Sequence, residues 1–191
     1  LLSAPHGAPH LRADRWKGED EYTASLAVVI GKLTGASVIF VKKRTREDPN
    51  WLPRARYKDA LRQVVHEQGI GFLADIHGAD MRREYKINVG IIDDADPARC
   101  SCPRFKPVIE EALRGFQYPL FNLDAFTGGS PGTVTTFARQ VCGIEAAQVE
   151  INARYRIVER KPDSTRARRG DRPHFRAEAS HVLELVHCLE G

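Results

Sequence analysis

The sequence has little of what defines several classes of protein. Only four cysteines, two tryptophans and one methionine occur among 191 residues. The longest apolar runs, around Leu26–Ile30 and Val38–Val41, are far shorter than the roughly 18 residues that cross a bilayer, so we expect no membrane-spanning segment. Scattered cysteines do not form a disulfide scaffold, and Cys100 and Cys102 lack the spacing of a zinc knuckle. We therefore expect a reducing, cytoplasmic location.

The composition is that of a folded domain. Hydrophobic residues make up 42% of the chain and charged residues 28%, which excludes disordered and fibrous classes. The length fits one domain of roughly 100 to 200 residues, so residues 1–191 are predicted to form a single domain. The chain opens on a strand-like run without Met, which is compatible with further residues upstream of this numbering.

The net charge of +4 is concentrated in one segment. Six basic residues and three acidic ones lie between Glu159 and Arg172. We predict an exposed Arg-rich loop at about 158–173, inserted before the last helix. Nucleic acid is not the expected partner, because this segment has no aromatic residue on which a base could stack.

Short strand-like runs alternate with helical ones along the chain, which predicts an α/β fold. Most of these strand-like runs are largely apolar and do not alternate, as in strands covered on both faces. We predict a three-layer sandwich with a mixed, largely parallel sheet and helices on both faces. The predicted strands are Leu1–Ala4, Ser37–Val41, Gly71–Ile76, Ile87–Ile92 and Ala146–Ile151, and the predicted helices are Tyr22–Leu33, Tyr57–Gln68, Pro107–Gly115, Thr133–Cys142 and His174–Leu189.

Two histidines, each followed by glycine, are placed where open α/β sheets form their sites. His6 follows the first strand and His77 ends a later one, in the strings Ser-Ala-Pro-His-Gly and Asp-Ile-His-Gly. Both imidazoles should therefore meet at one sheet edge, which favours metal ligation. Asp75 lies two residues before His77, on the same face of the strand, and could orient its ring. His66, His174, His181 and His187 are interpreted as ordinary polar residues, and His10 is left undecided.

A zinc site needs a further ligand, and carboxylates are available. One of Glu19, Asp20 and Glu21 could supply it, although acidic residues at this position also simply favour a helix start. Glu150 lies in an apolar strand, where it could act as the general base of metal-assisted hydrolysis. The pattern equally allows a structural pairing of Glu150 with Arg154 or Arg156.

Two loops could contact a substrate. Arg44, Asp48 and Asn50 follow the second strand, and arginine with asparagine can clamp a carboxylate or an amide carbonyl. A second loop has the sequence Phe-Thr-Gly-Gly-Ser, where Gly128 would let the backbone approach a ligand or simply make a turn. Its spacing is not that of a phosphate-binding loop.

The order of these motifs resembles the N-formylglutamate amidohydrolase family, whose fold is related to zinc carboxypeptidases. The matching pieces run from residue 1 to about 156: Ser3-Ala4-Pro5-His6-Gly7, Asp20-Glu21-Tyr22-Thr23, Arg44 with Asp48-Pro49-Asn50, Asp75-Ile76-His77-Gly78, Thr127-Gly128-Gly129 and Val149-Glu150-Ile151-Asn152. Each string is short and common, so the resemblance depends on their shared order and separation.

The resemblance implies one Zn²⁺ bound by His6, His77 and a carboxylate. Asp20, three residues before Thr23, fits the family pattern best, with Glu21 as the other candidate. It further implies that Glu150 is the general base and that the substrate is an N-acyl amino acid such as N-formylglutamate, or a small peptide.

The resemblance also implies substrate contacts. Asn50 would help to hold the substrate, with Asp48 and Gly128 in the same loops. The chain departs from the family at Trp51, where an arginine that binds the substrate carboxylate is usual. Arg44 or Arg154 could take its place, as could Arg54, and Arg44 is also a candidate for oxyanion stabilisation.

Two other functions compete with the hydrolase. A non-catalytic basic module would bind nucleic acid or an acidic partner through the Arg-rich segment, and it would show strong salt dependence and no metal. A degenerate relative, marked by Trp51, would bind metal without turnover.

Overall fold

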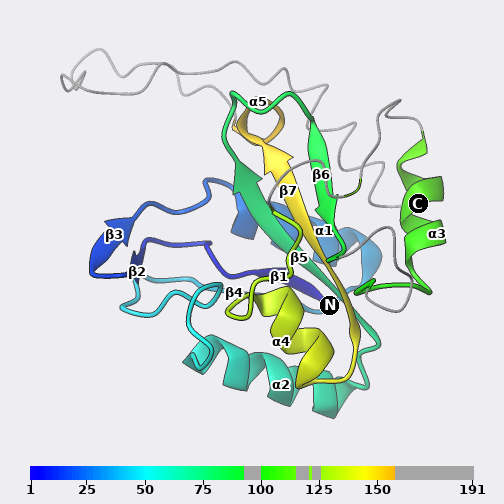
Figure 1. Ribbon diagram of the computed structural model, residues 1–191, viewed down its shortest axis with the longest axis horizontal. Helices are drawn as coiled ribbons and strands as arrows, with labels where there is room; N and C mark the ends of the chain where they lie inside the picture. The colour runs from blue at the N-terminus through cyan, green and yellow to red at the C-terminus, as the bar shows by residue number, and fades with distance from the viewer. Residues whose placement is uncertain (93–99, 115–120, 122–125, 158–191) are drawn as a thin grey trace.

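The structure is a computed structural model and describes residues 1–92, 100–114, 121 and 126–157. Five strands form its main sheet: β1 (Leu2–Ala4), β4 (Val38–Phe40), β5 (Phe72–Ala79), β6 (Ile87–Gly90) and β7 (Glu145–Asn152). Their order is β4-β1-β5-β7-β6 (Figure 1). All neighbours are parallel except β6, which is antiparallel to β7. The predicted mixed, largely parallel sheet is confirmed.

Helices cover both faces of this sheet, as predicted. They are α1 (Thr23–Thr34), α2 (Arg56–Gln68), α3 (Lys106–Ala112), α4 (Val134–Gln140) and α5 (Ala153–Arg156). Helix α1 packs against β1, β4 and β5, whereas α4 packs against β5 and β7 with α2 beside it (Figure 1). Ile76 of β5 packs in the core cluster that contains α1, and Leu73 in the cluster that contains α2 and α4. These two residues point to opposite faces because they are an odd number of positions apart.

The helix ends follow the signals in the sequence. Helices α1 and α2 end at Gly35 and Gly69, whose φ angles of 73° and 62° are left-handed and favour glycine. Helix α4 begins after Thr133, whose side chain accepts a hydrogen bond from the backbone N–H of Thr136. The predicted helices that fall within the described residues therefore exist, with ends displaced by a few residues.

A two-stranded hairpin, β2 (His10–Arg12) and β3 (Arg15–Lys17), is absent from the predicted elements. Its turn residues, Ala13 and Asp14, have φ angles of 46° and 60°. Positive φ at both central residues is the requirement of a type I′ hairpin turn, which glycine or asparagine usually signals. The strands of the hairpin are short and rich in charge, so apolar periodicity does not detect them.

Several predictions fall outside the described residues or concern the whole chain. The Arg-rich loop at about 158–173 and the helix His174–Leu189 lie outside the described residues. Within the described ranges, no helix is both long enough and apolar enough to span a membrane. Cys100 and Cys102 are buried as free thiols.

The sheet carries a row of buried polar side chains on the face that packs against α2 and α4. Ser3 of β1 is paired in register with Asp75 of β5, which is paired in turn with Gln148 of β7. Two residues further along each strand, His77 is paired with Glu150. These five side chains are each at most 5% exposed. Buried polar groups require hydrogen-bond partners. In this part of the sheet, polar contacts therefore take the place of apolar packing.

The two-faced core gives a stability prediction. Leu61 of α2 is 0% exposed, whereas Leu33 of α1 is 54% exposed. We expect Leu61→Ala to lower the free energy of unfolding by about 2–5 kcal/mol, because it removes buried methyl groups and leaves a cavity. The same substitution at Leu33 should change it by no more than about 0.5 kcal/mol. Denaturant unfolding of both variants measures the difference, and equal losses would contradict this description of the core.

Candidate functional site

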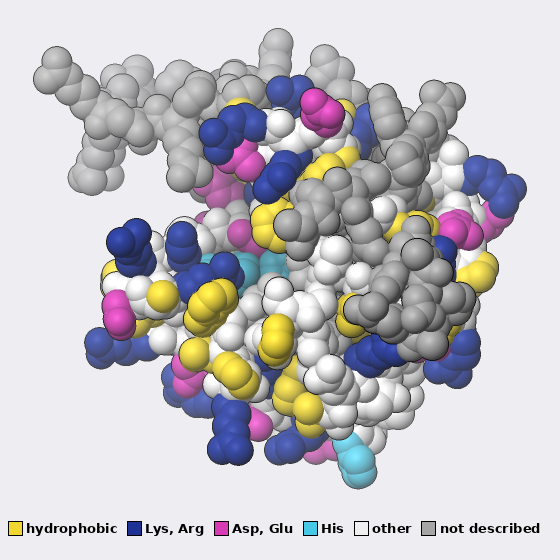
Figure 2. Space-filling model, viewed as in Figure 1, with side chains coloured by type: hydrophobic (Ala, Val, Ile, Leu, Met, Phe, Trp, Pro, Cys, Tyr) yellow, Lys and Arg dark blue, Asp and Glu magenta, His cyan; other side chains and the backbone are white. Residues whose placement is uncertain are grey.

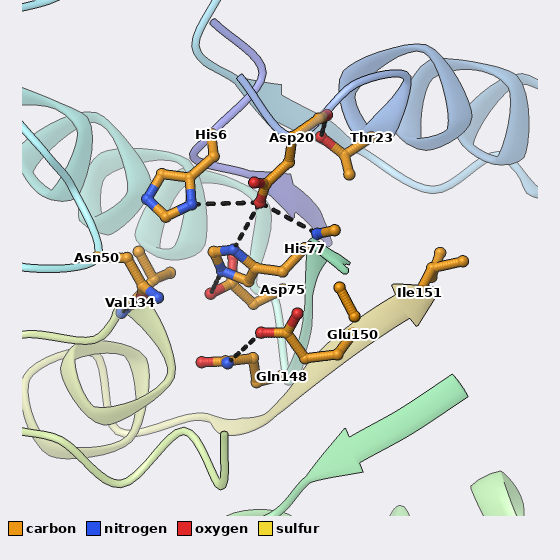
Figure 3. A network of polar contacts seen from close by, with 12 residues as sticks. His6, Asp20, Thr23, Asn50, Asp75, His77, Val134, Gln148, Glu150 and Ile151 are labelled. Atoms are coloured by element: carbon orange, nitrogen blue, oxygen red, sulfur yellow. Dashed lines mark hydrogen bonds and ion pairs between the residues drawn. The ribbon is translucent and has the colours of Figure 1, made fainter. Parts of the chain in front are cut away.

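Three segments that are distant in sequence meet at one carboxylate oxygen (Figure 3). Oδ2 of Asp20, just before α1, lies 3.3 Å from Nδ1 of His6 and 3.3 Å from Nδ1 of His77. The backbone N–H of Gly78 donates to the same oxygen at 3.1 Å. The two imidazole rings are 4.8 Å apart between centroids. The sheet edge therefore brings both predicted histidines together, with Asp20 between them.

The other nitrogen of each imidazole faces a fully buried carboxylate. Nε2 of His77 is 3.1 Å from Oδ2 of Asp75, the contact expected from their spacing on one strand face. Nε2 of His6 is 2.9 Å from Oδ1 of Asp48. Both aspartates are 0% exposed. Because a carboxylate only accepts hydrogen bonds, it fixes a proton on each Nε2 and turns both Nδ1 atoms toward Asp20.

The carboxylate behind His77 is itself held in place. The hydroxyl of Ser3 donates to Oδ1 of Asp75 at 2.6 Å and lies 2.7 Å from the hydroxyl of Tyr57. The Tyr57 hydroxyl also donates to the backbone carbonyl of Ile39 at 3.0 Å. Burial raises the pKa of Tyr57 well above its ordinary value, and the charge of Asp75 adds to this effect. Tyr57 therefore stays a neutral hydrogen-bonding residue that ties α2 to the site.

The pKa values of the cluster are shifted by the contacts between its imidazoles and carboxylates. Burial alone would lower the pKa of His6, but its hydrogen bonds to Asp20 and Asp48 outweigh burial and raise it. Burial likewise opposes the charged form of His77, yet Asp75 and Asp20 raise its pKa well above the ordinary value. Burial alone would raise the pKa of Asp20, but its hydrogen bonds to the two histidines hold it well below its ordinary range. The cluster thus concentrates negative charge that a cation can balance.

The donor set fits a divalent metal such as zinc. His6, Asp20 and His77 each offer one ligand atom, and these atoms lie within 4.8 Å of one another. Two imidazole nitrogens and one carboxylate oxygen, with carboxylates behind the imidazoles, are the ligand types of catalytic zinc sites. Such ligands bind metal when deprotonated, so a metal would replace the protons that the raised pKa values of His6 and His77 imply.

A second group, His6, His10 and Asp48, satisfies the same distance criterion. The ring of His10 stacks on that of His6, with centroids 4.1 Å apart. However, Asp48 already forms an ion pair with Nε of Arg12. The guanidinium supplies positive charge to this carboxylate, so the Asp20 group is the better cation site. His10, undecided from the sequence, lies beside the cluster as a packing partner of His6.

Glu150 lies next to His77 on the neighbouring strand. Its side chain is 5% exposed, and its Oε1 accepts a hydrogen bond from Nε2 of Gln148 at 2.8 Å. Figure 3 shows the carboxylate at the same sheet edge as the His6, Asp20 and His77 cluster. Arg154, one suggested structural partner, is exposed. Arg156, the other, donates to the backbone carbonyls of Glu21, Ala79 and Ile151.

The remaining predicted residues lie at varying depth around the cluster. Glu21 is exposed, and only its backbone carbonyl contacts Arg156, so Asp20 is the acidic residue that faces both histidines. Oδ1 of Asn50 accepts a hydrogen bond from the backbone N–H of Val134 at 2.8 Å, at the start of α4. Gly128 has a φ of 76° and is buried. Its carbonyl accepts hydrogen bonds from two threonine hydroxyls, Thr133 and Thr136.

Arg44 is not in contact with His6, Asp20 or His77 within the described residues. Its guanidinium carbon lies 3.5 Å from the ring centroid of Trp16 on the hairpin, and the residue is exposed. Asp48, expected to hold substrate, is buried behind His6 instead of facing an open space. The catalytic role of Arg44 and the substrate-binding roles of Asp48, Asn50, Gly128 and Arg154 stay predictions.

Two arginines at the site have contacts that the sequence did not predict: Arg156 is suggested there only as a partner of Glu150, and Arg12 is not singled out. Arg156 is 7% exposed and connects the loop of Asp20 to the ends of β5 and β7 through three backbone carbonyls. A Cβ at Gly78 would collide with its guanidinium, which explains the glycine after His77. Arg12 lies on the unpredicted hairpin and contacts Asp48. For both arginines the only signal in the sequence is positive charge, which does not distinguish them from surface residues.

Comparisons with known proteins support the fold. No protein-family model matches the sequence, and no curated protein matches it. Among solved structures, N-formylglutamate amidohydrolase from Ralstonia eutropha JMP134 matches with a TM-score of 0.60 and 14% identity, over 99% of this chain and 89% of that one. Pyroglutamyl peptidase I from Bacillus amyloliquefaciens matches with a TM-score of 0.42 and 10% identity, over 99% and 92%. The first match shows a shared α/β fold.

The buried carboxylates give a prediction about metal affinity. We expect Asp75→Asn to weaken Zn²⁺ binding by about 10- to 100-fold, because the amide no longer fixes the proton on Nε2 of His77. Asp48→Asn should act in the same way through His6. Competitive titration with a chelating indicator measures the dissociation constants. As a control, Asp59→Asn on α2, whose side chain is 72% exposed, should leave the affinity unchanged.

Proposed function

We propose that this protein is a zinc-dependent hydrolase that cleaves an amide bond of an N-acyl amino acid, such as N-formylglutamate, or of a small peptide. One observation carries the proposal: Nδ1 of His6 and Nδ1 of His77 face one oxygen of Asp20, while each Nε2 is held by its own buried carboxylate. A purely structural histidine pair does not need two buried aspartates behind it, because burying carboxylates has a large desolvation cost.

The metal would be bound by His6, Asp20 and His77. When bound, zinc lowers the pKa of water toward neutrality and polarises a carbonyl group. Asp48 and Asp75 keep the imidazoles oriented and raise their basicity as ligands. Two contacts hold the loop that contains Asp20. Arg156 donates to the backbone carbonyl of Glu21, and the backbone N–H of Asp20 donates to the carbonyl of His6 at 2.9 Å.

Glu150 would act as the general base. It projects from the strand next to His77, and its side chain is only 5% exposed. The carboxylate would accept a proton from the attacking water and later transfer it to the nitrogen of the leaving amine. Gln148 donates to Oε1 and so holds the carboxylate in one orientation.

The substrate class has separate support. The solved structure with a TM-score of 0.60 to this chain is an N-formylglutamate amidohydrolase, and the motifs of residues 1–156 follow that family's order. At 14% identity the shared fold does not fix the substrate, so the acyl group is to be found by screening. A cytoplasmic location stays a prediction from the cysteines.

The proposal predicts about one Zn²⁺ per chain in the purified protein and hydrolysis of N-formyl or other N-acyl amino acids. His6→Ala and His77→Ala should lose the metal and the activity together. Glu150→Gln should retain zinc but lower kcat by about 10²- to 10⁴-fold, because the amide cannot accept the proton. Metal analysis and a ninhydrin assay of the released amine measure both.

The matched control is Glu145→Gln on the same strand. The Glu145 carboxylate binds Arg104 at the far end of β7, so this variant should keep nearly full activity. Full activity of zinc-loaded Glu150→Gln would remove Glu150 from the mechanism. Protein that cannot be loaded with metal would favour a basic binding module, and protein that binds zinc without turnover would be a degenerate relative.

A further inference from the structure

Arg12 is an arginine held at the border between the buried site and the surface. It lies in β2, and its Nε forms an ion pair with Oδ2 of Asp48, the carboxylate whose other oxygen faces His6. Its guanidinium carbon is 5.6 Å from the ring centroid of Trp51. The side chain of Arg12 is 32% exposed, and Trp51 is 54% exposed. One edge of the guanidinium is therefore fixed in the protein while the remainder is open to a ligand.

Within the part of the chain that the structure describes, Arg12 forms its ion pair through Nε, and neither of its terminal Nη atoms has a hydrogen-bond partner. A guanidinium presents its donors in a planar fork that matches a carboxylate with two parallel hydrogen bonds. The Asp48 contact and the Trp51 ring restrict the rotamers of Arg12, so less side-chain entropy is lost when a ligand binds.

The surroundings favour an anion. Figure 2 shows histidine side chains in a hollow of the molecule, with Lys and Arg side chains gathered along one side and hydrophobic side chains beside them. The hairpin adds the exposed Arg15 and Lys17. The inner part of the site carries Asp20 and Glu150, which would repel a carboxylate. A negatively charged end of a substrate would thus lie toward the hairpin, with its amide toward the histidines.

We propose that Arg12, supported by Trp51, is the residue that binds a carboxylate of the substrate. The protein then prefers N-acyl amino acids with a free carboxylate over their amides. This inference rests on the proposed hydrolase function and specifies its substrate. The preference for a free carboxylate would then come from Arg12 on the hairpin, which lies outside the main sheet. Arg44 and Arg154 would not be needed to bind the carboxylate.

The test measures binding instead of turnover. In zinc-loaded Glu150→Gln protein, calorimetry compares N-formyl-L-glutamate with N-formyl-L-glutamine amide, which has no carboxylate. Adding Arg12→Gln should weaken binding of the acid by about 10- to 100-fold, since a charge-assisted hydrogen-bonded pair is lost. Binding of the amide should change less than about threefold, because the amide makes no ion pair with Arg12.

Two controls separate this role from a structural one. Arg15 is paired in register with Arg12 across the hairpin, so Arg15→Gln removes the same charge from the same element and should leave the preference for the acid intact. Arg12→Lys retains the charge beside Asp48 and should retain zinc while losing part of the preference for the acid. Zinc content is measured for every variant.

Three results would overturn the proposal. These are an equal loss for acid and amide in Arg12→Gln, an equal effect of Arg15→Gln, and no binding of the acid to the zinc-loaded protein. Failure of the hydrolase function gives a different result, because wild-type protein would then lack zinc or turnover whatever the preference between acid and amide.

Discussion

The contact of one Asp20 oxygen with two imidazoles is the constraint on which this structure depends. His6, Asp20 and His77 come from the end of β1, the start of α1 and the end of β5, and all three lose most of their contact with water. Grouping ionisable side chains in this way is favourable only when every polar atom has a partner. Asp48 and Asp75 pair with the outer nitrogens of the two imidazoles, and the N–H of Gly78 donates to the shared oxygen of Asp20.

This constraint extends into the packing of the fold. Tyr57 on α2 reaches Ser3, which holds Asp75, so the helix on that face is positioned partly by polar contacts. Lys58, the next residue, is 1% exposed and donates to the backbone carbonyls of Leu52 and Gly132. Burial lowers the pKa of Lys58 to about 8. These bonds connect the loop that contains Asp48 to the segment before α4, so the loops of the site are held from behind.

The distribution of charge around the site is the basis for the proposed binding of an anionic substrate by one end. Carboxylates are concentrated inside, at Asp20 and Glu150, where the proposed metal ion would balance their charge. Arginine lies at the border, where Arg12 shares Asp48 with His6. A fold shared with a protein of 14% identity does not by itself determine chemistry, which depends on this arrangement of side chains.

Local patterns in the sequence determined the strands of the main sheet, the helices that end at glycine, and the position of His6 and His77 at the ends of strands. These features depend on periodicity and on residues close in sequence, which a single chain displays directly. The contact of Asp75 with His77 was also predictable, because two residues on one strand share a face.

Only the tertiary structure decided which acidic residue faces the histidines. Asp20 and Glu21 are neighbours of similar chemistry, and the direction of each side chain is set where the loop meets β5 and Arg156. The hairpin and Arg12 were not predicted, because its short charged strands show no periodic pattern of apolar residues and its Ala-Asp turn lacks the usual glycine or asparagine signal. Contacts between segments that are far apart in sequence depend on how the sheet brings their ends together, and local patterns do not encode that placement.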